Sequence, residues 1–220
     1  MRFTYKKTTE IKQSGNTLNN KILRKEFCAF LLEFMNKHYI IIFLDECSFN
    51  LQYHPSYAWA ERNKRATEII RSKSNNYSVL AFFYFGGIMA FSITRGGLDA
   101  QTFSSLFNEF YEHYQHSYQK EKIIFILDNA KIHSANFTNL TILERFIVKF
   151  LPPYSPQLNP IEYCFKKWKF LVKKERPFNE SLLVKSIINA AKQISFKDGL
   201  GFYLKLCENM KGAYLLKDLE

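Results

Sequence analysis

The chain has 220 residues, which is enough for one sizeable hydrophobic core with appendages. Hydrophobic residues make up 47% and aromatic residues 17%, a composition that excludes an intrinsically disordered chain. The net charge of +11 favours a polyanionic partner, with nucleic acid preferred over an anionic membrane surface. Charge alone fixes no chemistry, because a structural RNA-binding protein would carry the same excess.

Residues 1–37 are polar and basic, with eight Lys or Arg against three Glu, and they lack the apolar core of a signal peptide. Within them, the spacing of Phe27, Phe30, Leu31 and Phe34 predicts a helix over residues 21–36. We interpret residues 1–37 as a linker or strap that precedes the main body of the protein.

From Tyr39 on, short apolar runs alternate with amphipathic segments. The expected strands are residues 39–44, 57–60, 79–85, 88–94, 122–127 and 146–150. One expected helix begins after an N-cap at Asp99, a second begins near Ser134, and a third begins with Asn159 as its N-cap and Pro160 as its first residue. Two more helices are expected over residues 180–194 and 197–210. This order of strands and helices predicts a mixed sheet flanked by helices.

One uncharged stretch, residues 77–94, has about the minimum length for a membrane-spanning helix. Gly86-Gly87 lies in its middle, between aromatic and β-branched residues, so two strands joined by a tight turn are the better interpretation. The cysteines (Cys28, Cys47, Cys164 and Cys207) form no CxxC motif, which is typical of reduced thiols in a cytosolic protein. We therefore expect a cytoplasmic protein with no membrane contact.

Two of the five aspartates follow near-identical apolar strands, Asp45 after residues 41–44 and Asp128 after residues 124–127. The carboxyl ends of sheet strands are where α/β proteins build their sites, so we expect the two carboxylates to converge if the strands are neighbours. Converging carboxylates repel each other, which requires a proton or a cation between them. Oxygen ligands without a His or Cys cluster favour Mg²⁺ or Mn²⁺ over zinc. Two such ions about 4 Å apart are the usual arrangement for in-line attack at phosphorus.

The third candidate carboxylate is Glu162, in the first turn of the helix that follows the proline-rich loop 151–160. Each candidate has a purely structural alternative. Asp45 and Asp128 could be turn residues at strand ends, and Glu162, three residues after Asn159, could cap its own helix.

The sequence around these carboxylates closely resembles the DDE transposases of the mariner superfamily, in their bacterial insertion-sequence branch. The resemblance rests on residues 43–49, 128–133 and 151–162 and on the separation of 34 positions from Asp128 to Glu162. It implies an α/β, RNase H-like mixed five-stranded sheet flanked by helices. It also implies that Asp45, Asp128 and Glu162 form a catalytic triad that binds two Mg²⁺ or Mn²⁺ ions.

The same resemblance implies a function and partners. A transposase catalytic domain cleaves DNA strands at transposon ends and transfers them into target DNA, at a TA dinucleotide in this family. The implied partners are double-stranded DNA and a second copy of the chain in a homodimer on DNA, in a bacterial, nucleoid-associated setting. Family members carry helix-turn-helix units before the catalytic domain, and about 37 residues cannot hold them. We therefore assign the catalytic domain to residues 38–220 and expect a separately encoded helix-turn-helix partner.

Basic residues cluster beside the proposed site. Lysines and arginines are dense over residues 62–73 and on the outer face of the helix that carries Glu162. A solvated helix face would explain the second cluster; contact with the phosphate backbone of DNA is the alternative. The candidate DNA-binding residues are Arg62, Lys64, Arg65, Lys131, His133, Lys166, Lys169 and Lys173.

Two other functions remain open from the residues. A nucleic-acid-binding remnant of a decayed transposase would keep the charge and lose the chemistry. A phosphatase or another α/β phosphotransferase would use carboxylates too, but Asp45 lies in no Asp-x-Asp pattern and the chain has no glycine-rich phosphate loop.

Overall fold

The computed structural model describes residues 13–52, 59–67, 75–114, 122–128 and 146–218. The described residues form one mixed sheet with the strand order β3-β2-β1-β4-β5. Its strands are β1 (Ile40–Phe49), β2 (Tyr77–Tyr84), β3 (Gly87–Arg95), β4 (Ile123–Leu127) and β5 (Ile147–Phe150). The pairs β1/β2 and β2/β3 are antiparallel, whereas β4 pairs in parallel with both β1 and β5. The five-stranded mixed sheet is therefore confirmed.

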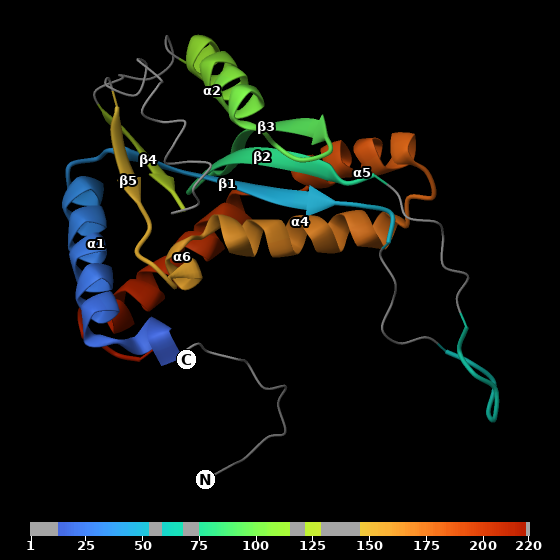
Figure 1. The fold of residues 1–220 in the computed structure, drawn as a ribbon, viewed down its shortest axis with the longest axis horizontal. Coiled ribbons are helices and arrows are strands. Elements are labelled where there is room, and N and C mark those ends of the chain that lie inside the picture. Colours follow the sequence, from blue (N-terminus) through green and yellow to red (C-terminus); the bar gives the residue numbers. More distant parts are fainter. Residues whose placement is uncertain (1–12, 53–58, 68–74, 115–121, 129–145, 219–220) are drawn as a thin grey trace.

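Helices cover both faces of this sheet (Figure 1). They are α1 (Leu18–Asn36), α2 (Ala100–Tyr114), α4 (Ile161–Glu175), α5 (Glu180–Lys192) and α6 (Phe196–Tyr214), with short 3-10 turns η1 (Gln13–Asn16) and η4 (Pro156–Leu158). Side chains alternate along β1, so Ile42 and Leu44 pack toward α2 while Phe43 and Cys47 pack toward the face that holds α1, α4, α5 and α6. The alternation divides the core into two layers. Asp45 lies on the same side of β1 as Phe43 and Cys47.

Helix α1 begins earlier than the periodicity predicts. Thr17 caps it by accepting a hydrogen bond from the backbone of Asn20, which starts the helix at Leu18. Its apolar face is buried in the core that it shares with α6, through Phe27 and Leu31. The part of residues 1–37 that is described thus packs on the sheet domain, and its interpretation as a linker stays a prediction.

The uncharged stretch 77–94 forms the hairpin of β2 and β3. Gly87 sits in the turn with a φ of +114°, a backbone conformation that side chains with a Cβ disfavour. Among the described residues, no helix has both the length and the apolar character needed to cross a membrane.

Two expected elements differ from the structure or fall outside it. Residues 57–58 lie outside the described residues, so the strand expected at 57–60 is tested only in part. Residues 134–145 also lie outside them, so the helix expected from Ser134 is not tested. Trp59 and Ala60 are described and belong to no strand, so at these two positions the strand prediction is wrong. With Trp59 fully exposed, no buried apolar partner favours strand pairing there.

Candidate active site

Asp45 lies inside β1 rather than at its end. The antiparallel pairing with β2 continues past it to Phe49, with Asp45 opposite Ala81, whereas the parallel pairing with β4 stops at Leu44 opposite Leu127. The sequence predicted a strand that ends before Asp45, and the longer partner β2 is the physical reason that β1 continues. Since Asp45 and Asp128 each follow a paired leucine directly, the register brings the two carboxylates together at the end of β4.

Helix α4 brings Glu162 to the same place. Its buried stripe, which includes Ile161, Trp168 and Val172, packs the helix along β1 (Figure 1). Glu162 stands in the first turn and is half-buried. The negative charges of Asp128 and Glu162 both raise the pKa of the Asp45 carboxyl, so the carboxyl groups on β1, just after β4 and in the first turn of α4 lie near one another.

Asp45 is the most deeply buried member of this group, with 9% of its surface exposed. The pKa of the Asp45 carboxyl is raised to about 7, first by burial and then by the charges of Asp128 and Glu162, against hydrogen bonds from Glu46 and Asn159 that lower it. Asp45 therefore keeps its proton to a higher pH than an exposed aspartate does, and a bound cation would displace that proton.

Asn159 is the site residue that the sequence analysis missed. It was predicted to cap α4, but Pro160 occupies the N-cap position and makes no side-chain cap. The Asn159 side chain instead donates a hydrogen bond from Nδ2 to Oδ2 of Asp45 at 2.8 Å. Asn159 has the extended backbone expected before proline, but an N-cap residue has the same conformation, so this restriction does not distinguish the two roles. The alternative role of Glu162 as a capping glutamate has no cap bond to support it.

A fourth acidic residue, Glu46, stands next to the group. It is half-buried, and both burial and the charge of Asp128 raise the pKa of its carboxyl. Its backbone N–H donates to Oδ1 of Asp45 at 2.8 Å, so it contributes to the site through its main chain as well.

The donor set fits a hard cation. All of the converging ligands are oxygens, and the two buried thiols nearby, Cys47 and Cys164, have pKa values raised by burial, which keeps them protonated. Among the described residues, no three His, Cys, Asp or Glu side chains stand close enough together to ligate one ion. The type of donor favours Mg²⁺ or Mn²⁺.

The candidate DNA-binding residues fall into three groups. Arg62, Lys64 and Arg65 are exposed, and Lys64 pairs with Glu61. On α4, Lys166 is exposed and Lys169 and Lys173 are half-buried. These lysines follow Glu162 by 4, 7 and 11 residues, which places all three on the same face of the helix as Glu162. The last group, Lys131 and His133, lies outside the described residues.

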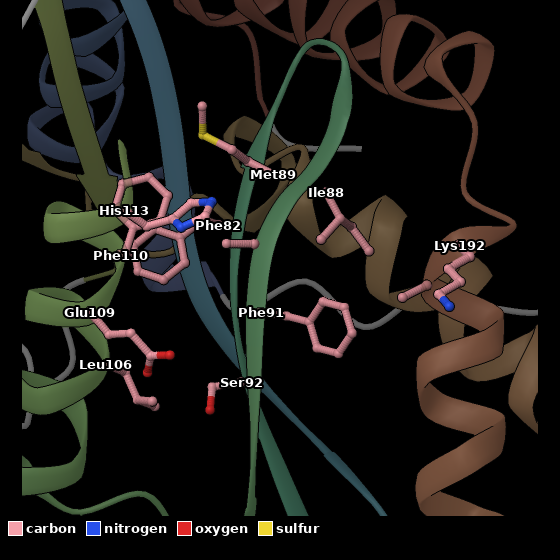
Figure 2. Close-up of a pocket in the computed structure, with 12 residues that line it drawn as sticks. Phe82, Ile88, Met89, Phe91, Ser92, Leu106, Glu109, Phe110, His113 and Lys192 are labelled. Atoms are coloured by element: carbon pink, nitrogen blue, oxygen red, sulfur yellow. The ribbon is translucent and has the colours of Figure 1, made fainter. Parts of the chain in front are cut away.

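A groove lies away from the carboxylates. It has a volume of about 490 Å³ and runs across β3, between α2 and α5, with Phe91, Glu109 and Lys192 among its lining residues (Figure 2). None of the three converging carboxylates lines it. Its walls are mostly apolar side chains, so it does not supply the oxygen donors that the carboxylate cluster offers.

Comparison with known proteins decides the family. Residues 40–182 match the family described as DDE superfamily endonuclease, and this match covers more than half of the chain. The chain belongs to the DDE superfamily endonucleases. No curated protein sequence matches it.

Solved structures similar to this DDE endonuclease come from a mariner transposase. The pre-cleavage Mos1 transpososome has 17% sequence identity and a TM-score of 0.77, over 99% of this chain and 68% of that chain. The Mos1 paired-end complex with Mn has 16% identity and a TM-score of 0.76, over 100% and 68%. The catalytic domain of Mos1 has 18% identity and a TM-score of 0.67, over 93% and 97%. At these identities the likeness shows the fold, and it confirms the RNase H-like prediction.

The raised pKa of Asp45 predicts how stability depends on pH. The folded carboxyl has a pKa of about 7 against an ordinary value of 3.8, so the stability from its bound proton is present at low pH and lost as pH rises to about 7. We expect the unfolding free energy of Asp45→Asn, relative to that of the metal-free wild type, to rise by roughly 2 kcal/mol between pH 5.5 and 8.5, because only the wild-type carboxyl loses its proton in this range. Thermal melts across this range measure it.

The control for this prediction is Asp99→Asn, because Asp99 is an exposed helix cap and asparagine caps equally well. We expect no comparable pH-dependent gain in that variant. A difference between Asp45→Asn and wild type that stays constant from pH 5.5 to 8.5 would show that Asp45 ionises normally.

Proposed function

We propose that this chain is the catalytic domain of a transposase, which cleaves DNA strands at transposon ends and joins them to target DNA. The observation that carries the proposal is the convergence of Asp45, Asp128 and Glu162, from two sheet strands and a helix, within a domain of the DDE endonuclease family. Transposition complexes and metal-containing structures of Mos1 share the fold, which supports the proposal.

The three carboxylates would hold two Mg²⁺ or Mn²⁺ ions. Bound there, the ions would supply charge neutralisation for in-line attack at phosphorus. The chain contributes the geometry: β1 and β4 fix Asp45 and Asp128 at adjacent positions of the register, and α4 supplies Glu162. Burial makes an unneutralised carboxylate at Asp45 costly, so a bound cation would replace the proton there.

Two phosphoryl-transfer steps would follow at this site, a hydrolysis and then a transesterification. In the first, water attacks the phosphodiester at the transposon end, the bond from phosphorus to the 3′-oxygen breaks, and the products are a 3′-hydroxyl on the transposon end and a 5′-phosphate on the flanking DNA. In the second, that hydroxyl attacks a target phosphodiester, forms a new phosphorus–oxygen bond and displaces a target 3′-hydroxyl. A direct test offers the chain a pre-cut duplex of its element's terminal repeat and a supercoiled plasmid with Mn²⁺. Joined product supports the function, and its absence with an added DNA-binding partner would contradict it.

The partners follow from the same proposal. We propose that two copies act together on DNA and that sequence-specific recognition of the ends resides in a helix-turn-helix part outside these 220 residues, since base readout needs a recognition element that fits a groove. A binding titration of the terminal repeat and a scrambled duplex at fixed salt tests this. A preference of this chain alone above about tenfold would place recognition within it.

The basic face of α4 is the proposed contact for the DNA backbone. Lys166, Lys169 and Lys173 follow Glu162 along one face, so a strand bound at the carboxylates would have its neighbouring phosphates beside them. Lys167 points elsewhere and pairs with Asp198 at 2.5 Å, which separates it from this face. The positive N-terminal end of α4 would also favour a phosphate.

Replacing Lys166, Lys169 and Lys173 together by glutamine is expected to weaken DNA binding equally for all sequences. The slope of log K against log salt should become shallower by about 0.9 for each phosphate contact that is lost. Fluorescence anisotropy at several salt concentrations measures both quantities.

The matched control removes three exposed lysines from α5 and α6, as Lys185→Gln, Lys197→Gln and Lys211→Gln together. The net charge falls by the same amount in both triple variants, so a site effect appears only as their difference. Equal salt slopes for the two variants would make the α4 lysines an ordinary solvated face.

A further inference from the structure

Asn159 holds the Asp45 carboxylate from the loop that precedes α4. Only 3% of its surface is exposed, and its Nδ2 donates to Oδ2 of Asp45 at 2.8 Å. The other oxygen, Oδ1, accepts from the backbone N–H of Glu46, also at 2.8 Å. With one donor on each oxygen, the carboxyl plane is fixed, and each oxygen keeps a lone pair for a further ligand.

The backbone of Asn159 contacts the residue that carries another of the carboxylates. Its carbonyl accepts a hydrogen bond from the N–H of Glu162 at 3.2 Å, in the first turn of α4. One residue therefore connects two members of the site: the side chain contacts the Asp45 carboxylate, and the main chain contacts the start of the helix that carries Glu162.

The backbone at Asn159 is itself restricted. Pro160 follows it, and a residue before proline is confined to extended conformations, here with φ −109° and ψ 96°. Leu158 and Pro160 on either side are both buried, so the loop cannot shift without opening the core. The direction in which the Asn159 side chain leaves the loop is thus determined by packing.

Among the described residues, the remaining polar atom of this side chain has no partner: Oδ1 of Asn159 is buried and accepts no hydrogen bond from them. A buried acceptor without a donor costs free energy, so its presence beside the carboxylates indicates a donor that none of the described residues supplies.

We propose that Asn159 is the positioning residue of the metal site, which sets the orientation of Asp45 and its spacing from Glu162. Oδ1 then serves as the acceptor for a water molecule in the coordination sphere. This inference rests on the proposed function, since it assumes that Asp45 and Glu162 bind a cation. Groups that orient metal ligands typically contribute tenfold to hundredfold to metal affinity, although they touch no metal.

The test measures Mn²⁺ binding to the full chain by the loss of the free-ion EPR signal. We expect Asn159→Ala to weaken binding by about tenfold to hundredfold. The matched control is Asn209→Ala, because the Asn209 amide also tethers this loop and α4, through Gln157 at 2.7 Å and Tyr163 at 3.1 Å, rather than a carboxylate. An Asn159→Ala variant that binds Mn²⁺ as well as this control would overturn the inference.

Two further measurements complete the design. Asp45→Asn distinguishes the proposed metal site from the role of Asn159. If Asp45→Asn binds Mn²⁺ like wild type, the proposed metal site is wrong. If Mn²⁺ binding is lost in Asp45→Asn and kept in Asn159→Ala, only the role of Asn159 is wrong. NMR on the wild-type chain needs no folded variant. The side-chain amide signal of Asn159 should shift with Mg²⁺ at the same midpoint as the backbone amide of Asp45, while that of Asn209 stays unchanged. An Asn159 side-chain signal that does not shift when Mg²⁺ is added would contradict the proposal.

Discussion

Replacing Asp45, Asp128 or Glu162 by its amide is expected to lower the rates of strand cleavage and joining by about a thousandfold or more. Each carboxylate contributes ligand charge to a site whose ions stabilise the transition state by several kcal/mol, and about 4 kcal/mol corresponds to a thousandfold in rate. The amides keep the size of the side chains, so folding should be retained. A strand-transfer assay with a pre-cut end, together with circular dichroism, measures both properties.

The controls for the triad are amides at exposed acidic positions, Asp99→Asn on the cap of α2 and Glu208→Gln on α6, where Glu208 pairs with Lys205. These variants should keep full activity. If Glu162→Gln behaved like them, Glu162 would be a residue of the helix start and the third ligand would have to be sought elsewhere.

Activity is expected to require Mg²⁺ or Mn²⁺. Chelation with EDTA should abolish cleavage and joining, and either ion should restore them, because the converging carboxylates repel one another without a cation. Ca²⁺ should bind without supporting turnover, since its variable coordination misplaces the attacking and leaving oxygens. The measurement is product formation in a metal titration. Cleavage that continues in excess EDTA would exclude the metal mechanism.

The convergence of Asp45 and Asp128 could be predicted because it depends on a short, local signal. Two apolar runs of the same length each precede an aspartate, and buried parallel strands have such sequences. The structure places these strands side by side with Leu44 opposite Leu127, which is the register that the two patterns require. The position of Glu162 came instead from resemblance to the family, because no periodicity indicates which loop folds back onto β1.

The role of Asn159 could not be read from the sequence, because the same local pattern has two solutions. An asparagine before a proline at a helix start can cap the helix, or the proline can begin it and release the asparagine for a distant partner. The choice depends on Asp45, which lies 114 residues earlier in the chain. The extension of β1 to Phe49 has a similar origin, since only the length of β2 decides where the antiparallel pairing stops.

The pKa of Asp45 is another property that needed the structure. In the sequence, Asp45 is one aspartate after an apolar strand, and a carboxyl group in that place can be solvated or buried. Its burial at 9% exposure, with Asp128 and Glu162 nearby, determines that it titrates near neutral pH.

Diffraction from crystals of this chain grown with Mn²⁺ would locate the ion by its anomalous signal, without reference to activity. We expect Mn²⁺ among Asp45, Asp128 and Glu162 at oxygen distances slightly above 2 Å, with a second ion about 4 Å away when DNA is bound. We also expect that signal to be lost in crystals of Asp45→Asn. Manganese bound only at other positions, or absent from the carboxylates at millimolar concentrations, would contradict the assignment of this site.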